Sequence, residues 1–265
     1  YYDPAEQIFQ KRITLDEFKS MHFEIILCTL QEHERAFKQL RDFYQPQAKL
    51  IRLMGNTGEQ VDSEIFDGYI DTTGLYIFPE GKKSVIINQE FPIDPFIYTP
   101  PKNHKSIKNY MNCLREAQAY PVWQFLKREM KDYDFKMHGS NGDDGGITGL
   151  YNLGRSMQDM GFLFQFKHQG EGFGHVIHNS YASGRPAIVL YEFYKGKLAS
   201  KFLIDNYSAI LLDDITPKEA MDKIRYWSEP ERHRKMCENS YNLFKKYVNF
   251  EEDEIKFKKF LEQVL

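Results

Sequence analysis

"GFLFQFKHQGEGFGHVIHNSYASGRPAIVL", residues 161–190, joins an apolar run, a glycine-rich turn and a second apolar run. The runs at 161–167 and 186–190 are short and apolar, which is typical of strands buried on both faces of a parallel sheet. The segment after the turn is predicted to be a helix that ends at Gly184, because Pro186 prevents its continuation. The stretch therefore predicts a strand, a tight turn, a helix and a second parallel strand.

The same alternation of strands and helices extends along the rest of the chain. Further strands are expected at 23–30, 48–54, 83–91, 107–112, 134–139 and 208–214, and helices at 32–44, 121–132 and 148–159 and in three closing segments. Strong start signals precede the closing helices: Thr216 before Pro217, Ser228 before Glu231, and Asn249 before Glu252. This order of elements predicts an α/β protein with parallel sheets.

A proline-rich segment, "FPIDPFIYTPPKNHK" at 91–105, separates two groups of these elements. Its prolines lack amide donors and fit neither a helix nor the interior of a sheet, so a domain boundary is predicted there. We expect an N-terminal α/β domain at 1–105, a second domain at 106–249, and a terminal helix at 250–265 that packs back toward the first domain.

Composition limits the classes of function. The 265 residues include 42% hydrophobic and 28% charged residues with a formal net charge of -3, which gives no support to nucleic-acid binding. The cysteines, Cys28, Cys113 and Cys237, show no paired spacing, and we expect a cytoplasmic, reducing setting. No run approaches the roughly 18 apolar residues of a membrane span, which leaves only peripheral membrane contact open.

The glycine turn has the features of an anion site. Gly170, Gly172 and Gly174 allow a tight turn and a close approach of a ligand to the backbone. The helix that follows directs its free amides and the positive end of its dipole to the same point, so a phosphate or diphosphate is the expected ligand. On this helix, His175, His178 and Asn179 share one face. They are either polar contacts to that ligand or satisfied interior groups, and the spacing alone does not decide between the two.

These motifs resemble those of the retaining nucleotide-sugar glycosyltransferases of the GT-B fold. The resemblance rests on E-G-F-G followed by a helix and G-x-P, on "DFKMHGSNGDD" and "LGRSMQDMGFLFQFKHQ" before it, and on the closing strand and helices from "DNYSAILLDD" onward. It extends from about residue 107 to the C-terminus. It implies two Rossmann-like domains with parallel sheets facing across a cleft, of which the first is abbreviated or truncated in this chain.

The resemblance also implies roles for individual residues. Glu171 matches the first glutamate of the family's paired-glutamate motif, which lies beside the donor sugar, and is therefore the expected catalytic residue. The second glutamate, which grips the nucleotide ribose, is replaced here by Asn179, an uncharged amide that can still bond hydroxyls. Arg115, in the loop after the first strand of the second domain, is the candidate cation for the leaving diphosphate, with Lys167 and His168 as alternatives and a plain surface arginine as the simpler interpretation. The expected donor-binding residues are Gly170, Gly172, Phe173, Gly174, His175, Asn179 and Arg115.

The expected reaction is transfer of a sugar from a nucleotide-diphosphate donor to the hydroxyl of a glycan or another acceptor, with retention of anomeric configuration. The resemblance implies that no metal or cofactor is required, and the sequence agrees, since Asp143 and Asp144 fit a turn that binds its own amides better than a metal site. Asn88, Gln89 and Glu90 are suitably placed to contact an acceptor but also fit a solvent-facing rim. A nucleotide-sugar epimerase or hydrolase of the same fold and a non-catalytic nucleotide-sugar-binding module remain as alternatives.

Overall fold

The computed structural model describes residues 12–62, 64–112, 114–167 and 171–265. Contacts divide the chain into two compact units. Unit 1 is formed by Phe91–Val248, and unit 2 by the residues up to Glu90 together with Asn249–Leu265. The chain thus passes from unit 2 to unit 1 between Glu90 and Phe91, earlier than the boundary predicted at residue 105.

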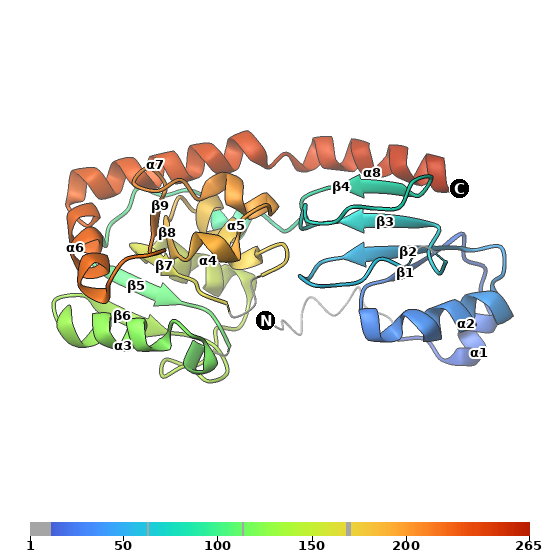
Figure 1. Ribbon diagram of the computed structural model, residues 1–265, viewed down its shortest axis with the longest axis horizontal. Coiled ribbons are helices and arrows are strands. Elements are labelled where there is room, and N and C mark those ends of the chain that lie inside the picture. The colour runs from blue at the N-terminus through green and yellow to red at the C-terminus, as the bar shows by residue number, and fades with distance from the viewer. Residues whose placement is uncertain (1–11, 63, 113, 168–170) are drawn as a thin grey trace. The chain divides into compact units, whose positions relative to one another are not determined.

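Unit 2 contains a four-stranded parallel sheet in the order β1-β2-β3-β4 (Figure 1). Its strands are β1 (Ile25–Cys28), β2 (Lys49–Met54), β3 (Gly68–Asp71) and β4 (Lys83–Ile86), and its helices are α1 (Leu15–Ser20), η2 (Gln31–His33), α2 (Glu34–Tyr44) and α8 (Phe250–Val264). Strand β3 was missing from the sequence-based expectation, as was α1. The three expected strands form, although each is shorter than its apolar run.

The two faces of this sheet are covered by different helices. Along β2, Leu50 and Met54 pack in a cluster that includes Phe37 of α2. Ile51 points to the opposite face and packs against Phe260 and Val264 of α8. This alternation follows from the two-residue period of a strand, and it explains why a helix at the far end of the sequence belongs to the first sheet.

Unit 1 contains a five-stranded parallel sheet in the order β6-β5-β7-β8-β9 (Figure 1). Its strands are β5 (Ser106–Asn109), β6 (Asp134–Met137), β7 (Phe162–Phe164), β8 (Ala187–Val189) and β9 (Ala209–Leu211). Its α-helices are α3 (Tyr120–Glu129), α4 (Leu150–Gln158), α5 (His175–Ala182), α6 (Pro217–Trp227) and α7 (Pro230–Tyr247), and its short 3-10 helices are η3 (Asp94–Phe96), η4 (Leu114–Glu116), η5 (Tyr191–Phe193) and η6 (Leu198–Phe202). Two α/β units with parallel sheets confirm the fold class predicted from the alternation of elements.

Helices α3 and α6 contact each other, and α5 contacts α4 and α7. Trp123 and Leu126 of α3 and Ile224 of α6 are buried in one cluster with Phe164 and Ile188 from the sheet. Helix α5 carries six buried residues in its eight, which gives it a fixed place beside the strand ends. In the part of the chain that the structure describes, no helix has the length and apolar character needed to cross a lipid bilayer.

The end of α5 is fixed by Arg185, whose side chain is fully buried. Its Nη1 donates to Thr99 O at 2.9 Å, and its Nη2 donates to Gln158 O at 2.5 Å. The guanidinium thereby joins the segment after η3 to the end of α4 and to the turn that follows α5. Burial is tolerated because backbone carbonyls accept its protons.

Gly154, in the middle of α4, lies very close to the backbone of Pro95 in η3. A Cβ added there would lie 1.9 Å from Pro95 O. We expect Gly154→Ala to destabilise the protein by about 1–3 kcal/mol, because the steric conflict outweighs the better helix propensity of alanine. Urea unfolding followed by circular dichroism measures the change. Gly146→Ala is the matched control, since a Cβ there meets nothing within 4 Å; equal stability of the two variants would contradict the close approach.

Candidate functional site

The glycine-rich turn lies after β7, at the carboxyl edge of the unit 1 sheet, where parallel α/β folds hold their ligands. Gly170 and His168 lie outside the described residues, and the described chain resumes at Glu171. Gly174 is the N-cap of α5 and has a left-handed backbone with φ of 78°. A Cβ on Gly174 would lie 3.4 Å from Glu171 Oε2, so both the backbone angle and the space favour glycine. The turn brings the Glu171 carboxylate to the start of α5.

Glu171 is only 7% exposed, and the protein occupies both of its carboxylate oxygens. Gln165 Nε2 donates to Oε1 at 2.8 Å, and the Tyr194 hydroxyl donates to Oε2 at 3.4 Å. Burial raises the pKa of Glu171, while the charge of Lys167 and these hydrogen bonds act against that shift. The result is a carboxylate whose position is set by uncharged partners from two strand ends.

A lysine holds the backbone of the same turn. Lys197 Nζ donates to Glu171 O at 2.5 Å and to Phe193 O. The side chain is 6% exposed, and burial lowers its pKa. Gln165, Tyr194 and Lys197 were not predicted from the sequence. The available signals were a glutamine between two buried phenylalanines in "FLFQFK" and a lysine directly after a glycine in "YKGKL".

The polar face of α5 divides into exposed and buried groups. His175 is exposed at the first position of the helix, whereas His178 is fully buried and Asn179 is 6% exposed. The ring of His178 stacks on Phe173 with centroids 3.8 Å apart, and its Nδ1 lies 3.0 Å from Gly174 O. His178 is therefore an interior histidine that supports the turn. Its Nε2 and Asn179 Oδ1 have no hydrogen-bond partner among the described residues.

Arg115 lies in η4 and forms an ion pair with Asp143, and both side chains are about half exposed. Asp144 Oδ2 accepts from Met137 N, at the end of β6, at 2.8 Å. No hydrogen bond or ion pair among the described residues joins Arg115 to Glu171. The described part of the chain also contains no cluster of three histidine, cysteine or acidic side chains placed to hold a metal ion.

Three cavities lie elsewhere on the two units. An apolar cavity of about 230 Å³ at the carboxyl edge of the unit 1 sheet is lined by Gln118, Ala119, Val122, Phe166, Leu190, Leu212, Ile215, Pro217 and Ala220. In unit 2, a cavity of about 260 Å³ is lined by Leu53, Ile70, Thr72, Ile87, Asn88, Gln89, Glu90, Phe250, Asp253, Glu254 and Phe257. The second cavity includes all three residues considered for acceptor contact. Within it, Asn88 is already engaged, since its Nδ2 donates to Asp253 Oδ2 at 2.7 Å.

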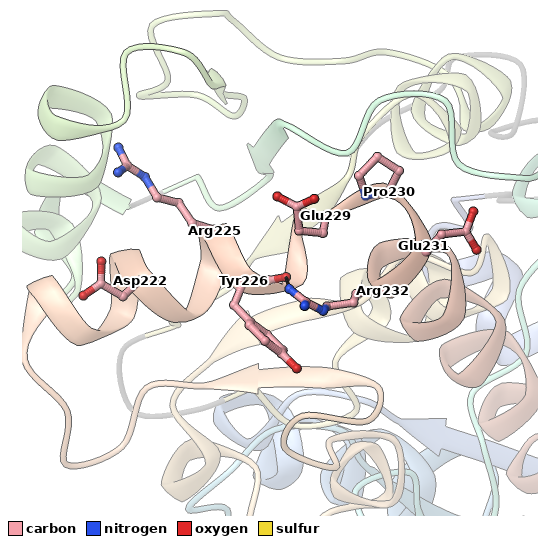
Figure 2. A pocket seen from close by; sticks show the side chains of 7 residues that line it. All are labelled: Asp222, Arg225, Tyr226, Glu229, Pro230, Glu231 and Arg232. Carbon is pink, nitrogen blue, oxygen red and sulfur yellow. Dashed lines mark hydrogen bonds between the residues drawn. The ribbon is translucent and has the colours of Figure 1, made fainter.

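Figure 2 shows the third, an open hollow of about 640 Å³ where α6 meets α7. Its charged side chains are of both signs, and the guanidinium of Arg232 lies 3.9 Å from the centroid of the Tyr226 ring. None of its lining residues comes from the glycine turn. The hollow is therefore separate from the candidate site.

Comparison with known structures identifies the fold. TarM superposes with a TM-score of 0.71 at 13% identity, over 93% of this chain and 57% of that one. The pneumococcal O-GlcNAc transferase GtfA, in complex with UDP and GlcNAc, gives 0.62 at 16% identity, over 94% and 59%. Anabaena Alr3699/HepE, in complex with UDP, gives 0.70 at 10% identity, over 94% and 80%. The chain thus has a GT-B-like fold and spans less than two thirds of TarM and GtfA.

Sequence comparison adds no assignment. No protein-family model matches the chain, and no curated protein matches it either. At 9–16% identity the structural likeness establishes the fold, while the activity has to be argued from the site.

Two buried histidines predict how stability depends on pH. Burial lowers the pKa of His178 to about 3 and that of His233 to about 4. The unfolded chain, with histidine pKa values of about 6.5, then binds more protons, so stability falls as pH drops below about 6.5. We expect each histidine to cost about 2 kcal/mol between pH 7 and pH 5.

Urea unfolding at the two pH values measures this loss in the wild type, His178→Gln and His233→Gln. Each variant is expected to lose less stability between pH 7 and pH 5 than the wild type, by about 2 kcal/mol. Identical pH dependence in all three proteins would show that these histidines do not remain neutral in the folded state.

Proposed function

We propose that this chain transfers a sugar from a nucleotide-diphosphate donor to an acceptor hydroxyl, with retention of anomeric configuration. One observation carries the proposal: the turn after β7 joins a buried carboxylate, Glu171, to the left-handed start of α5 at Gly174. Free amides and a dipole end favour a diphosphate, and an adjacent carboxylate favours the sugar attached to it.

In this proposal the donor lies across the turn. The backbone of Gly172, Phe173 and Gly174 and the first amides of α5 receive the diphosphate, with His175 beside it. Glu171 lies next to the sugar ring, and Asn179 bonds the ribose hydroxyls. Support for the ribose contact comes from Asn179 Oδ1, which is buried and has no partner among the described residues. An unpaired buried acceptor is costly unless a ligand satisfies it.

The reaction breaks the bond between the anomeric carbon and the β-phosphate oxygen, and the electron pair stays on the departing diphosphate. The acceptor oxygen forms its new bond on the same face of the sugar, and its proton passes to the leaving phosphate oxygen. Positive potential from α5 and neighbouring side chains stabilises the growing charge on the diphosphate. We propose that no metal ion is required, and retention of activity in EDTA tests this.

The neighbours guide the choice of substrates for the first experiments. GtfA was crystallised with UDP and GlcNAc and HepE with UDP, so UDP-sugars are the first donors to test. For the acceptor, we propose the cavity of unit 2, whose lining includes Gln89 and Glu90 as well as Phe250 and Phe257. A cavity with both polar and aromatic side chains suits a sugar, which has hydroxyl groups and an apolar face.

A second function, a non-catalytic nucleotide-sugar-binding module, is favoured by a specific observation. Both oxygens of Glu171 already have protein partners, and Asn179 provides no charge where the resembling family has a glutamate. Calorimetry and product analysis with UDP-, GDP- and ADP-sugars separate the functions. Transfer supports the proposal, binding without turnover supports the module, and turnover without acceptor supports an epimerase or hydrolase.

Glu171→Ala is expected to abolish transfer while UDP binding changes by less than about tenfold, or about 1.4 kcal/mol. The physical reason is that the carboxylate acts at the sugar, whereas the diphosphate is held by backbone amides. Steady-state kinetics and calorimetry measure the two effects. Glu192→Ala is the control, because Glu192 is 73% exposed in the nearby η5 helix. A fully active Glu171→Ala enzyme would remove this residue from the mechanism.

Asn179→Ala is expected to weaken UDP binding by about tenfold, because it removes hydrogen bonds to the ribose. The same variant should bind 2′,3′-dideoxy-UDP as tightly as the wild type does, since that ligand lacks the hydroxyls. Calorimetry of both ligands with both proteins measures the interaction energy between the Asn179 side chain and the ribose hydroxyls. An equal loss for both ligands would indicate that Asn179 only supports α5.

A further inference from the structure

We propose that Lys197, assisted by Lys167, is the cation that binds the diphosphate of the donor. This inference rests on the proposed function and assigns to Lys197 the role that the resemblance gave to Arg115. It concerns binding of the diphosphate and stabilisation of its charge as the bond to the anomeric carbon breaks, with no additional chemical step.

The environment of Lys197 favours an anionic ligand. Its side chain is 6% exposed, and Nζ donates to the carbonyl oxygens of Glu171 and Phe193. An ammonium group has three donors, so one remains for a ligand. The ion pairs formed among described residues include the neighbour Lys195, with Glu192, but not Lys197. The charge of Glu171 attracts Lys197, but its carboxylate oxygens form no ion pair with Nζ. A buried cation without a carboxylate in direct contact is expensive, and a bound anion is the usual way to compensate it.

Positive charge from two lysines, Lys167 and Lys197, accumulates around the turn. Burial lowers the pKa of Lys197 and of His175, and the charge of Lys167 acts in the same direction on both, while the charge of Glu171 acts against it on Lys197. Helix α5, whose first amides have no partner within the helix, begins at His175, four residues after Glu171. The Glu171 carboxylate opposes this positive charge, and its oxygens accept hydrogen bonds from Gln165 and Tyr194. A diphosphate would relieve the repulsion between the two lysines.

A buried side-chain oxygen in the same cluster also lacks a hydrogen-bond partner among the described residues. Gln165 is 1% exposed, its Nε2 is bound to Glu171, and its Oε1 has no hydrogen-bond partner among the described residues. A polar atom buried beside Glu171 without a partner indicates that a donor group completes the site when it is occupied. A sugar hydroxyl beside Glu171 would supply one.

Arg115 is less suited to this role. Its charge is balanced by Asp143, which also lies 3.7 Å from Lys127. Both members of the Arg115–Asp143 pair are about half exposed, so their net field at a distance is small and screened. Lys197, in contrast, contacts the backbone of Glu171 directly.

The test compares Lys197→Met with Lys195→Met, a matched change two residues away at a lysine that is 67% exposed. Calorimetry measures the binding of UDP, uridine and inorganic pyrophosphate. We expect Lys197→Met to weaken UDP and pyrophosphate binding by about tenfold to a hundredfold and to leave uridine binding within twofold. Lys195→Met should leave all three unchanged. Lys197→Arg should recover part of the loss, because arginine retains the charge.

Two results separate the inference from the proposed function. If the wild type binds neither UDP, GDP, ADP nor pyrophosphate, the proposed function fails. If the wild type binds UDP and folded Lys197→Met binds it equally well, only the assignment of Lys197 is overturned. Should Lys197→Met not fold, Lys167→Met decides, because Lys167 is exposed. A threefold to tenfold loss for UDP and pyrophosphate, with uridine binding unchanged, supports the lysine pair, and unchanged UDP binding overturns it.

Discussion

The burial of Glu171 is the constraint on which the candidate site depends. A carboxylate removed from water has to be held by donors, and here these come from Gln165 after β7 and from Tyr194 after β8. Lys197 holds the backbone of the same residue. The ends of two adjacent parallel strands are thereby joined through one side chain. The start of α5, which follows directly, is fixed by the same contacts and by the stacking of His178 on Phe173.

Local signals in the sequence predicted most of the elements. Thr216 forms the expected capping box with Glu219, and Asn249 caps α8. Ser228 was expected to cap α7 but instead ends α6, where its hydroxyl donates to Ile224 O. Strand β3, "GYID", was missed because four residues that include glycine and aspartate carry little strand propensity. It forms because both faces of the strand are buried between neighbouring strands and covering helices, and this is a tertiary effect.

The site was predictable only in part. Gly174 was expected from the glycine-rich turn and adopts a left-handed backbone, whereas the role of Glu171 was inferred from the family resemblance and stays a prediction. Lys197 is 26 residues from Glu171, and no local pattern indicates that their atoms meet. Arg115 was a candidate because the resemblance implies a cation in the loop after the first strand of this domain, but a nearby carboxylate, Asp143, competes for its side chain. Side-chain pairing of this kind depends on loop conformation, which spacing alone does not determine.

The position of α8 has a consequence for how the chain acquires its structure. The face of the first sheet that carries Ile51 and Ile70 is covered by Phe260 and Val264, which leave the ribosome only after all of unit 1 has been synthesised. Until then, an apolar sheet surface stays uncovered during translation. The earlier-made unit is therefore the later one to mature, and a chaperone that shields this surface would act on the nascent chain throughout the synthesis of the second unit.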